Sequence, residues 1–293
     1  MRIILHAGVQ CTDNERLIKT LLRNKETFAK AGVAVPPPKL YRNLLRKTLI
    51  KGINNNLDIG AREYLLETIL EGTSTQINTV ILSNPMFFGI PRELLRSGQL
   101  YPNAVKILEQ FLLLFSQDDV ELYFSIRNPA SFLPTVFETS ELAEFSALMK
   151  ASNPLEIQWS ELASRLHQAF PNLPIYMWCN EDSPFIWGQI LRLMGQLPAP
   201  KNIAGDFDLF ADIISKEGFD RFKAYISTHP SLTLRQLRIV MAAFAEKFGQ
   251  TEKIIEELEA PGWDHTLVQD LTDLYDDDLK DILKVPSVRF ILP

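Results

Sequence analysis

The chain has few cysteines and no long apolar run, and these two absences exclude some classes of protein. Only two of its 293 residues are cysteine, Cys11 and Cys179, and they form no CxxC motif. A disulfide framework is therefore not expected, and a reducing cytoplasm is the expected location. No apolar run reaches the ~18 residues that a membrane-spanning helix needs. No signal peptide is expected either, because His6 and Gly8 interrupt the apolar start of the chain.

Several sequence signatures of catalysis are also missing. The chain contains no GxxxxGK[ST] loop, no HExxH helix, no GxSxG turn and no dinucleotide-binding fingerprint. Asp276, Asp277 and Asp278 lack the alternating ligands and central glycine of a calcium loop, so we expect a helix start with a solvated acidic face there. The formal net charge of −6 argues against nucleic acid as a general partner. Metalloprotease, hydrolase and dehydrogenase chemistry thus lack support, and no metal site is predicted.

The residues that are abundant indicate a sizeable folded core. Hydrophobic residues make up 46% of the chain and aromatic residues 10%, which suits one large domain, alone or with an appendage. Lys and Arg outnumber acidic residues over residues 1–51, and the reverse holds from Thr251 onward. Two interpretations stay open: two solvated faces that attract each other, or a basic rim for an anionic ligand near the N-terminus.

The order of apolar segments predicts an α/β fold. Four short runs with strand character cover residues 2–7, 79–84, 120–126 and 174–179. Segments with helical spacing separate them, and this alternation predicts parallel neighbours in one sheet flanked by helices. Residues 33–35 and 287–292 are each either a short strand or an extended segment. From Pro200 onward the spacing is helical, so we expect a core over 1–199 and a helical C-terminal extension, packed on the core, over 200–293.

The first 24 residues predict a strand, a loop and a helix. The strand is followed by a turn of small and polar residues from Ala7 to Asn14, and a helical apolar face begins at Leu17. In such a unit the backbone N–H groups of the loop and the helix N-terminus form an anion site. Asp13 or Asn14 is the expected N-cap. The alternative is a connecting turn that binds nothing.

This stretch resembles the 5′-phosphosulfate loop of the sulfotransferase family, whose members use 3′-phosphoadenosine 5′-phosphosulfate. The family loop reads approximately His-x-Gly-x-x-Lys-Thr-Gly-Thr-Ser/Thr-x-Leu, and the residues in register are His6, Gly8, Thr12 and Leu17. The departures are Cys11 at the lysine, Asp13 at the second glycine, and Asn14 and Glu15 at the two hydroxyl positions. The resemblance implies a P-loop-like parallel sheet and a nucleotide site that includes Gly8, Thr12 and Asn14.

The altered loop weakens the expected binding of that nucleotide. Loss of the lysine removes a charge-assisted contact of ~1.5–3 kcal/mol, and a carboxylate near a phosphate oxygen adds repulsion. Arg16, Lys19 or Arg23 could supply the missing cation.

A second part of the chain resembles the 3′-phosphate site of the same family. Arg127 ends a predicted strand in the sequence Arg-x-Pro, and Thr135 stands eight positions later, where the family usually has serine. An arginine at a strand's carboxyl end presents a bidentate fork to phosphate. The alternative is an arginine that caps a helix or pairs with an acid. Residues 178–182 look like the fourth-strand segment of bacterial members, and the resemblance covers approximately residues 1–195.

The sequence assigns no general base. His6 lies at the root of the loop, where a hydrogen-bonded structural histidine is the alternative. Glu181 and Asp182 follow a predicted strand and are acid–base candidates, or they form an N-cap pair before Ser183. Cys11 at a helix N-terminus could carry a lowered pKa, which Asp13 would oppose.

Two functions are therefore expected from the sequence. The first is a sulfotransferase that transfers a sulfonate group from 3′-phosphoadenosine 5′-phosphosulfate to a hydroxyl-bearing acceptor. The second is a catalytically inactive relative that acts as a binding or regulatory module. The retained frame and Arg127 favour the first, whereas the substitutions from Cys11 to Glu15 favour the second.

Overall fold

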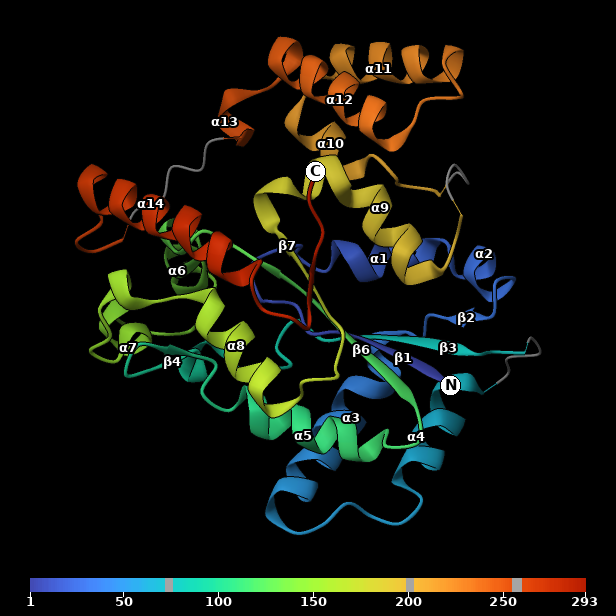
Figure 1. Ribbon diagram of the computed structural model, residues 1–293, viewed down its shortest axis with the longest axis vertical. Helices are drawn as coiled ribbons and strands as arrows, with labels where there is room; N and C mark the ends of the chain where they lie inside the picture. The colour runs from blue at the N-terminus through green and yellow to red at the C-terminus, as the bar shows by residue number, and fades with distance from the viewer. Residues whose placement is uncertain (72–75, 199–202, 255–259) are drawn as a thin grey trace.

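A six-stranded parallel sheet forms the centre of the protein, which a computed structural model describes over residues 1–71, 76–198, 203–254 and 260–293. The strand order is β2-β3-β1-β6-β7-β8 (Figure 1). The strands are β1 (Arg2–His6), β2 (Val33–Ala34), β3 (Thr79–Ser83), β6 (Asp119–Ile126), β7 (Ile175–Cys179) and β8 (Val288–Phe290). The predicted α/β fold is confirmed, and the four predicted strands are parallel neighbours. The two segments left open, at residues 33–35 and 287–292, each contain a short strand.

The register brings the loop after β1 and the end of β6 to the same edge of the sheet. Pairing continues beyond β1, because Ala7 N donates to Tyr123 O at 2.8 Å and Ser125 N donates to Gly8 O at 2.9 Å. Gly8 and Arg127 therefore lie at the carboxyl edge together, as predicted.

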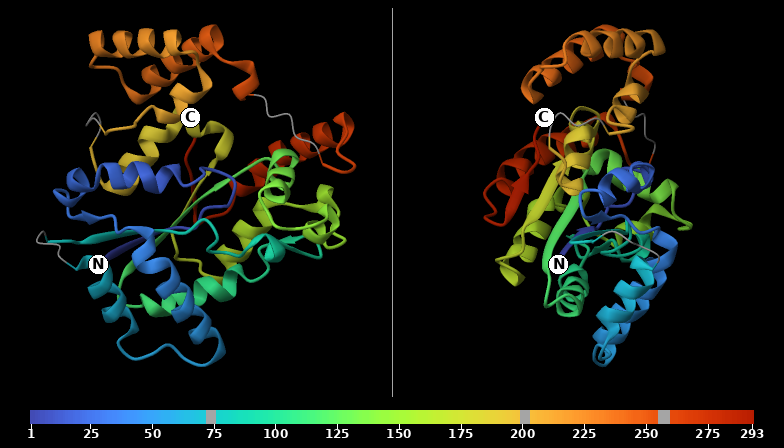
Figure 2. Two further views of the ribbon diagram at one scale, coloured as in Figure 1. Left: turned by 180° about the vertical axis from the view of Figure 1, so that it is seen from behind. Right: turned by 90° about the vertical axis from the view of Figure 1, so that its right-hand side faces the viewer.

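Helices cover both faces of the sheet, which explains why its central strands are almost wholly apolar (Figure 2). One face carries α1 (Arg16–Arg23), α2 (Lys25–Ala29) and α9 (Ser183–Gly195). The other carries α3 (Pro38–Asn54), α4 (Ala61–Leu70), α5 (Ala104–Leu114), α6 (Pro129–Glu138), α7 (Phe145–Met149) and α8 (Trp159–Ala169). Side chains of β1 alternate between the two layers: Ile4 packs in the first, and Ile3 and Leu5 pack in the second.

A small antiparallel hairpin lies in the connection between β3 and α5. It consists of β4 (Leu95–Arg96) and β5 (Gln99–Leu100). Its two turn residues, Ser97 and Gly98, have φ angles of 50° and 79°, and positive φ at both positions is what a tight two-residue hairpin turn needs.

The C-terminal region contains two structurally different parts. The first, which we call the helical arm, comprises α10 (Asp208–Ile213), α11 (Lys216–Thr228), α12 (Leu234–Phe248) and α13 (Thr251–Ile254). It stands beyond the carboxyl edge of the sheet (Figure 1) and has its own apolar cluster around Phe210 and Phe222. The second part, α14 (His265–Ile282) and β8, returns to the core. The expected boundary between residues 199 and 200 lies outside the described residues. Across the described ranges, no helix has both the length and the apolar character to cross a bilayer.

Candidate functional site

The carboxyl edge of the sheet borders a cleft of about 690 Å³ between the core and the helical arm. Segments that follow β1, β6 and β7 line it from the core side together with α14, and α10 and α13 line it from the side of the arm. Its polar and aromatic lining residues are Thr12, Arg127, Asn128, Ser131, Asn180, Glu181, Ser183, Phe185, Asp212, Lys253, Trp263 and Thr272. Two of the five predicted nucleotide-binding residues, Thr12 and Arg127, therefore line one cleft. Because the cleft lies beyond the carboxyl ends of parallel strands, it is where this class of sheet holds ligands.

Arg127 is the most extensively bonded side chain at this edge. It is buried, and its Nε donates to Ser131 Oγ at 3.0 Å. Its Nη2 donates to Thr135 Oγ1 at 3.0 Å, and its Nη1 donates to Cys11 O at 2.5 Å. The structure thus brings together Arg127, Thr135 and the loop after β1. Ser131 was missed in the sequence, although it stands four positions before Thr135 and therefore lies on the same face of α6.

The other predicted loop residues have local structural roles. Gly8 has a φ of 96°, and a Cβ at this position would lie 2.6 Å from Pro85 Cα. Thr12 uses its hydroxyl within the loop, donating to Val9 O at 2.6 Å. Asn14 is exposed in the left-handed region, with a φ of 47°. The glycine is therefore required by the approach of Pro85, without any ligand.

Asp13 occupies the place where an anion would bind at the start of α1. Its carboxylate Oδ2 accepts from Leu17 N at 2.8 Å, and its carbonyl accepts from Arg16 N at 2.8 Å. The residue at the N-cap position is Glu15, which has a φ of 65° and makes no capping hydrogen bond with its side chain. Neither Asp13 nor Asn14 stands at the N-cap position. Asp13, two residues before Glu15, instead accepts the backbone N–H of Leu17 in the first turn of α1.

Two of the three cations expected to replace the missing lysine are held by the helical arm. Arg16 pairs with Asp212 of α10, and Arg23 pairs with Asp208 at 2.5 Å. Their guanidinium groups are thus drawn toward α10. The exposed Lys19 is the remaining candidate.

The cofactor implied by the resemblance does not fit this loop as it is folded. A phosphosulfate group would need backbone N–H groups at the start of α1 and a nearby cation, but Asp13 already binds Leu17 N. At the lysine position, the Cys11 thiol lies 3.2 Å from Thr139 Oγ1, and burial raises the pKa of this thiol, which argues against a reactive thiolate. At the other end, the hydroxyl and guanidinium of Thr135 and Arg127 do form a set suited to phosphate.

His6 is a structural residue of the sheet. It is fully buried, its Nδ1 lies 2.9 Å from Ser83 Oγ, and its ring stacks on Trp178. Burial lowers the pKa of this imidazole, with the cationic Arg42 acting in the same direction. His6 is therefore a hydrogen-bonded structural histidine, which was the alternative interpretation of this residue, and the lowered pKa favours its neutral form.

Glu181 is the acid that lines the cleft from the core side. Its Oε1 accepts from Asn128 N at 2.8 Å, and its Oε2 accepts from Tyr275 Oη at 3.3 Å. The surrounding protein raises the pKa of this carboxyl, although the side chain remains open to the cleft. Asp182 stands at the N-cap position of α9 but makes no capping hydrogen bond. The expected N-cap pair is therefore not formed, and Glu181 instead joins the end of β6 to α14.

The acidic triplet at residues 276–278 is not a helix start. It lies inside α14, and Asp278 is buried. Asp278 Oδ2 accepts from Trp159 N at 2.7 Å and from Ser160 N at 3.2 Å, so it caps α8. Sequence reasoning missed this role, although Asp278 shares the helical spacing of the buried residues Leu271, Tyr275 and Ile282, which its solvated neighbours Asp276 and Asp277 do not.

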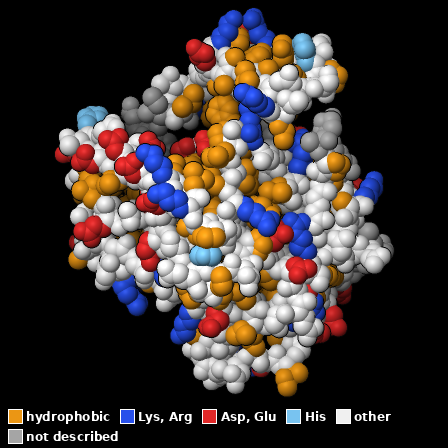
Figure 3. All heavy atoms as spheres, in the orientation of Figure 1, with side chains coloured by type: hydrophobic (Ala, Val, Ile, Leu, Met, Phe, Trp, Pro, Cys, Tyr) orange, Lys and Arg blue, Asp and Glu red, His pale blue; other side chains and the backbone are white. Residues whose placement is uncertain are grey.

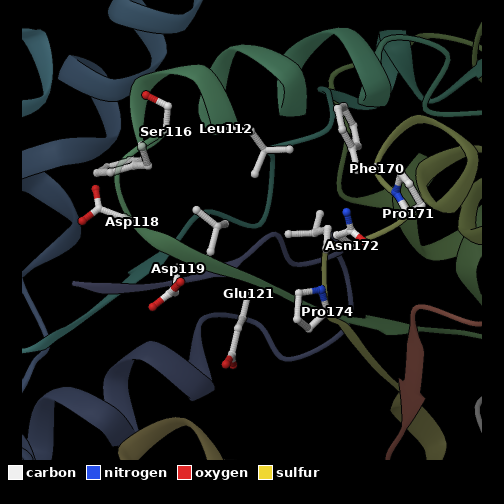
Figure 4. Close-up of a pocket in the computed structure, with 12 residues that line it drawn as sticks. Leu112, Ser116, Asp118, Asp119, Glu121, Phe170, Pro171, Asn172 and Pro174 are labelled. Atoms are coloured by element: carbon white, nitrogen blue, oxygen red, sulfur yellow. The ribbon is translucent and has the colours of Figure 1, made fainter.

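A second groove, of about 490 Å³, lies at the opposite edge of the sheet. It runs between the end of α5 and the segment before β7, across the start of β6 (Figure 4). Two of its acids are in ion pairs: Asp118 binds the N-terminal ammonium at 2.9 Å and Arg62 at 2.6 Å, and Glu121 binds Arg2 at 2.7 Å. These acids hold the N-terminal residues in place. The described residues that line this groove include none of those predicted for the nucleotide site.

Comparisons with family models, curated proteins and solved structures found no match. The structure in its described ranges also brings no three His, Cys, Asp or Glu residues into a group that could hold a metal ion.

Proposed function

We propose that this chain is a catalytically inactive relative of the sulfotransferases that acts as a binding module, with the cleft at the carboxyl edge as its ligand site. The observation that carries this proposal is the Asp13 carboxylate, which lies 2.8 Å from Leu17 N. A side chain of the protein thus fills the anion position at the helix N-terminus, where the resemblance would place the phosphosulfate.

Electrostatics support the same conclusion. A second anion about 4 Å from the Asp13 carboxylate would cost up to ~4 kcal/mol at a surface-like dielectric, which corresponds to roughly a thousandfold in affinity. The nearby acid–base groups give no compensating chemistry. His6 is buried and held neutral, and Glu181 already binds the backbone of Asn128.

A second candidate function is transfer of a sulfonate group from 3′-phosphoadenosine 5′-phosphosulfate to a hydroxyl acceptor. One observation favours it: Arg127, Ser131 and Thr135 converge at the end of β6 with distances of 3.0 Å. This set would hold the 3′-phosphate of such a nucleotide, and the nucleotide itself would supply the transferable group.

Calorimetric titration with adenosine 3′,5′-bisphosphate separates the two candidates. We expect no detectable binding by the wild-type chain, and binding by Asp13→Gly at least tenfold tighter than the detection limit, because glycine frees Leu17 N and removes the charge. Asp13→Asn is the matched control, since its amide oxygen can still accept from Leu17 N, and it should gain less than Asp13→Gly.

Two results would contradict the proposal. Tight binding by the wild type that Thr135→Ala weakens would favour the enzyme. Equal failure of wild type and folded Asp13→Gly would mean that Asp13 is not what closes the loop.

A further inference from the structure

The cleft that the proposed function assigns to a ligand is balanced in charge. Its charged lining residues in the described part of the chain are two cations, Arg127 and Lys253, and two acids, Glu181 and Asp212. A nucleotide bisphosphate carries about −1.5 to −2 on each phosphate group. A lining without excess positive charge does not attract such a ligand, and it does not select a strongly cationic one either.

Uncharged hydrogen-bonding groups dominate the rest of the polar lining. Asn128 and Ser131 follow β6, Asn180 and Ser183 follow β7, and Thr272 comes from α14. Amide and hydroxyl side chains both donate and accept. Among the described residues Asn180 makes no side-chain hydrogen bond, so its amide is available to a ligand. Asn128, Ser131 and Thr272 already bond within the protein, whereas a wholly apolar ligand would leave the Asn180 amide without a partner, at a cost of ~1–3 kcal/mol.

Glu181 adds a hydrogen-bond acceptor of fixed orientation to this polar lining. Each of its carboxylate oxygens holds one partner, Asn128 N at 2.8 Å and Tyr275 Oη at 3.3 Å. A carboxylate has about four lone-pair sites, so both oxygens can still accept. These two contacts also fix the carboxylate in place, so the side chain loses less conformational entropy when a ligand binds.

Aromatic side chains supply flat apolar walls. Trp263 is fixed by its Nε1, which donates to Ala130 O at 2.8 Å, and by an edge contact with Phe145. Its indole N–H is thus satisfied inside the protein, and the ring offers the cleft only apolar surface. Phe185 lines the cleft from α9. A rigid ring beside amide and carboxylate groups suits a ligand that has one apolar face and hydroxyl groups around it.

We propose that the cleft binds a neutral polyhydroxylated ligand, a saccharide, through Asn180 and Glu181 with Trp263 as its apolar wall. This assignment rests on the proposed function, because it requires that no nucleotide fills the same space. The ligand's hydroxyl groups donate to Glu181 and exchange donor and acceptor roles with Asn180. Its C–H face packs against the indole.

The test uses the fluorescently labelled full-length chain on an array of neutral and acidic glycans, followed by titration of the best neutral glycan. We expect Asn180→Ala and Glu181→Gln each to weaken binding about tenfold. Asp119→Asn, at the start of β6 in the opposite groove, is the matched control and should bind like the wild type.

Three outcomes overturn this inference. They are the absence of binding to any neutral glycan, stronger binding to acidic than to neutral glycans, and binding by Asn180→Ala and Glu181→Gln that equals that of the wild type. The nucleotide titration of the preceding section is run in parallel. Nucleotide binding that depends on Thr135 removes the proposed function itself, whereas a failed array with no nucleotide binding removes only the saccharide.

Discussion

At the scale of single residues, two aspartates show how a carboxylate can serve the fold from inside an acidic or polar stretch. Asp13 binds Leu17 N at the start of α1, and Asp278 binds the first N–H groups of α8 from a different helix. Both act as internal anions at helix N-termini. One bond is local in sequence and the other spans 119 positions.

Asp278→Ala tests the long-range cap. We expect a loss of about 1–3 kcal/mol in the free energy of unfolding, because two buried N–H groups lose their acceptor. Urea denaturation at neutral pH measures it. The matched control is Asp277→Ala, which removes an exposed carboxylate from the adjacent position and should change nothing measurable. Equal effects of both substitutions would contradict the capping role.

What the sequence reveals about single residues depends on how far apart their partners lie. Arg127 and Thr135 could be paired in advance, because they stand eight positions apart on a strand end and the helix after it. The role of Asp278 could not, because its partners lie on α8 and only the packing of α14 brings them near. Asp13 lies between these cases. Its negative charge in the loop could be read from the sequence, but its hydrogen bond to Leu17 N depends on the conformation of the turn, which the sequence did not predict.

At the scale of elements, the close contact between two loops fixes the path of the chain after β1. The backbone of Pro85, which follows β3, leaves no room for a side chain at Gly8. The glycine in the loop thus marks the packing of two neighbouring strand ends, which a sequence motif alone cannot separate from a phosphate-binding role.

Gly8→Ala and Gly60→Ala form a matched pair for this contact. Both glycines have positive φ, 96° and 80°, but a Cβ at Gly60 would meet nothing within 4 Å. We expect Gly60→Ala to cost about 1–2 kcal/mol from backbone strain. Gly8→Ala should cost a further ~1–3 kcal/mol from overlap with Pro85. Thermal unfolding of the two variants checks the difference, and similar melting temperatures would disprove the contact's importance.

The strands were predictable because their residues are apolar on both sides, which only a covered parallel sheet explains. The hairpin of β4 and β5 was not predicted, although Ser97-Gly98 is a turn signal, because two-residue strands carry too little pattern. The basic residues near the N-terminus pair with acids that lie before Thr251, which the uneven charge along the sequence did not predict. The basic N-terminal region meets the acids of α10, as in the pairs Arg16–Asp212 and Arg23–Asp208.

At the scale of the whole molecule, the α11–α12 part of the helical arm begins and ends at one point of the chain path. Ile214 and Gly249 pair in an antiparallel bridge, and Ser215 N donates to Phe248 O at 2.8 Å. Figure 3 shows hydrophobic side chains on the arm beside Lys and Arg side chains. Because the ends of α11 and α12 meet, residues 216–248 resemble an insertion, whereas α14 and β8 belong to the core.

Two shortened chains test this difference. Replacing residues 216–248 by Gly-Ser-Gly should leave a chain that unfolds cooperatively, because the bridge at Ile214 and Gly249 already brings the cut ends together. Ending the chain after residue 198 should prevent folding, because it removes β8, the Asp278 cap and the buried side chains of α14. Size-exclusion chromatography and near-ultraviolet circular dichroism measure both. A soluble, native-like truncated chain would show that α14 and β8 are dispensable.

The outer strands of the sheet have a consequence for association between copies of the chain. The sheet ends in β2, with two residues, and in β8, with three. Prolines at positions 36–38 follow β2, and Pro286 precedes β8. Proline lacks an N–H and cannot extend a ladder of backbone hydrogen bonds. Short strands bordered by proline leave other chains little to pair with, so the folded protein is protected against edge-to-edge aggregation.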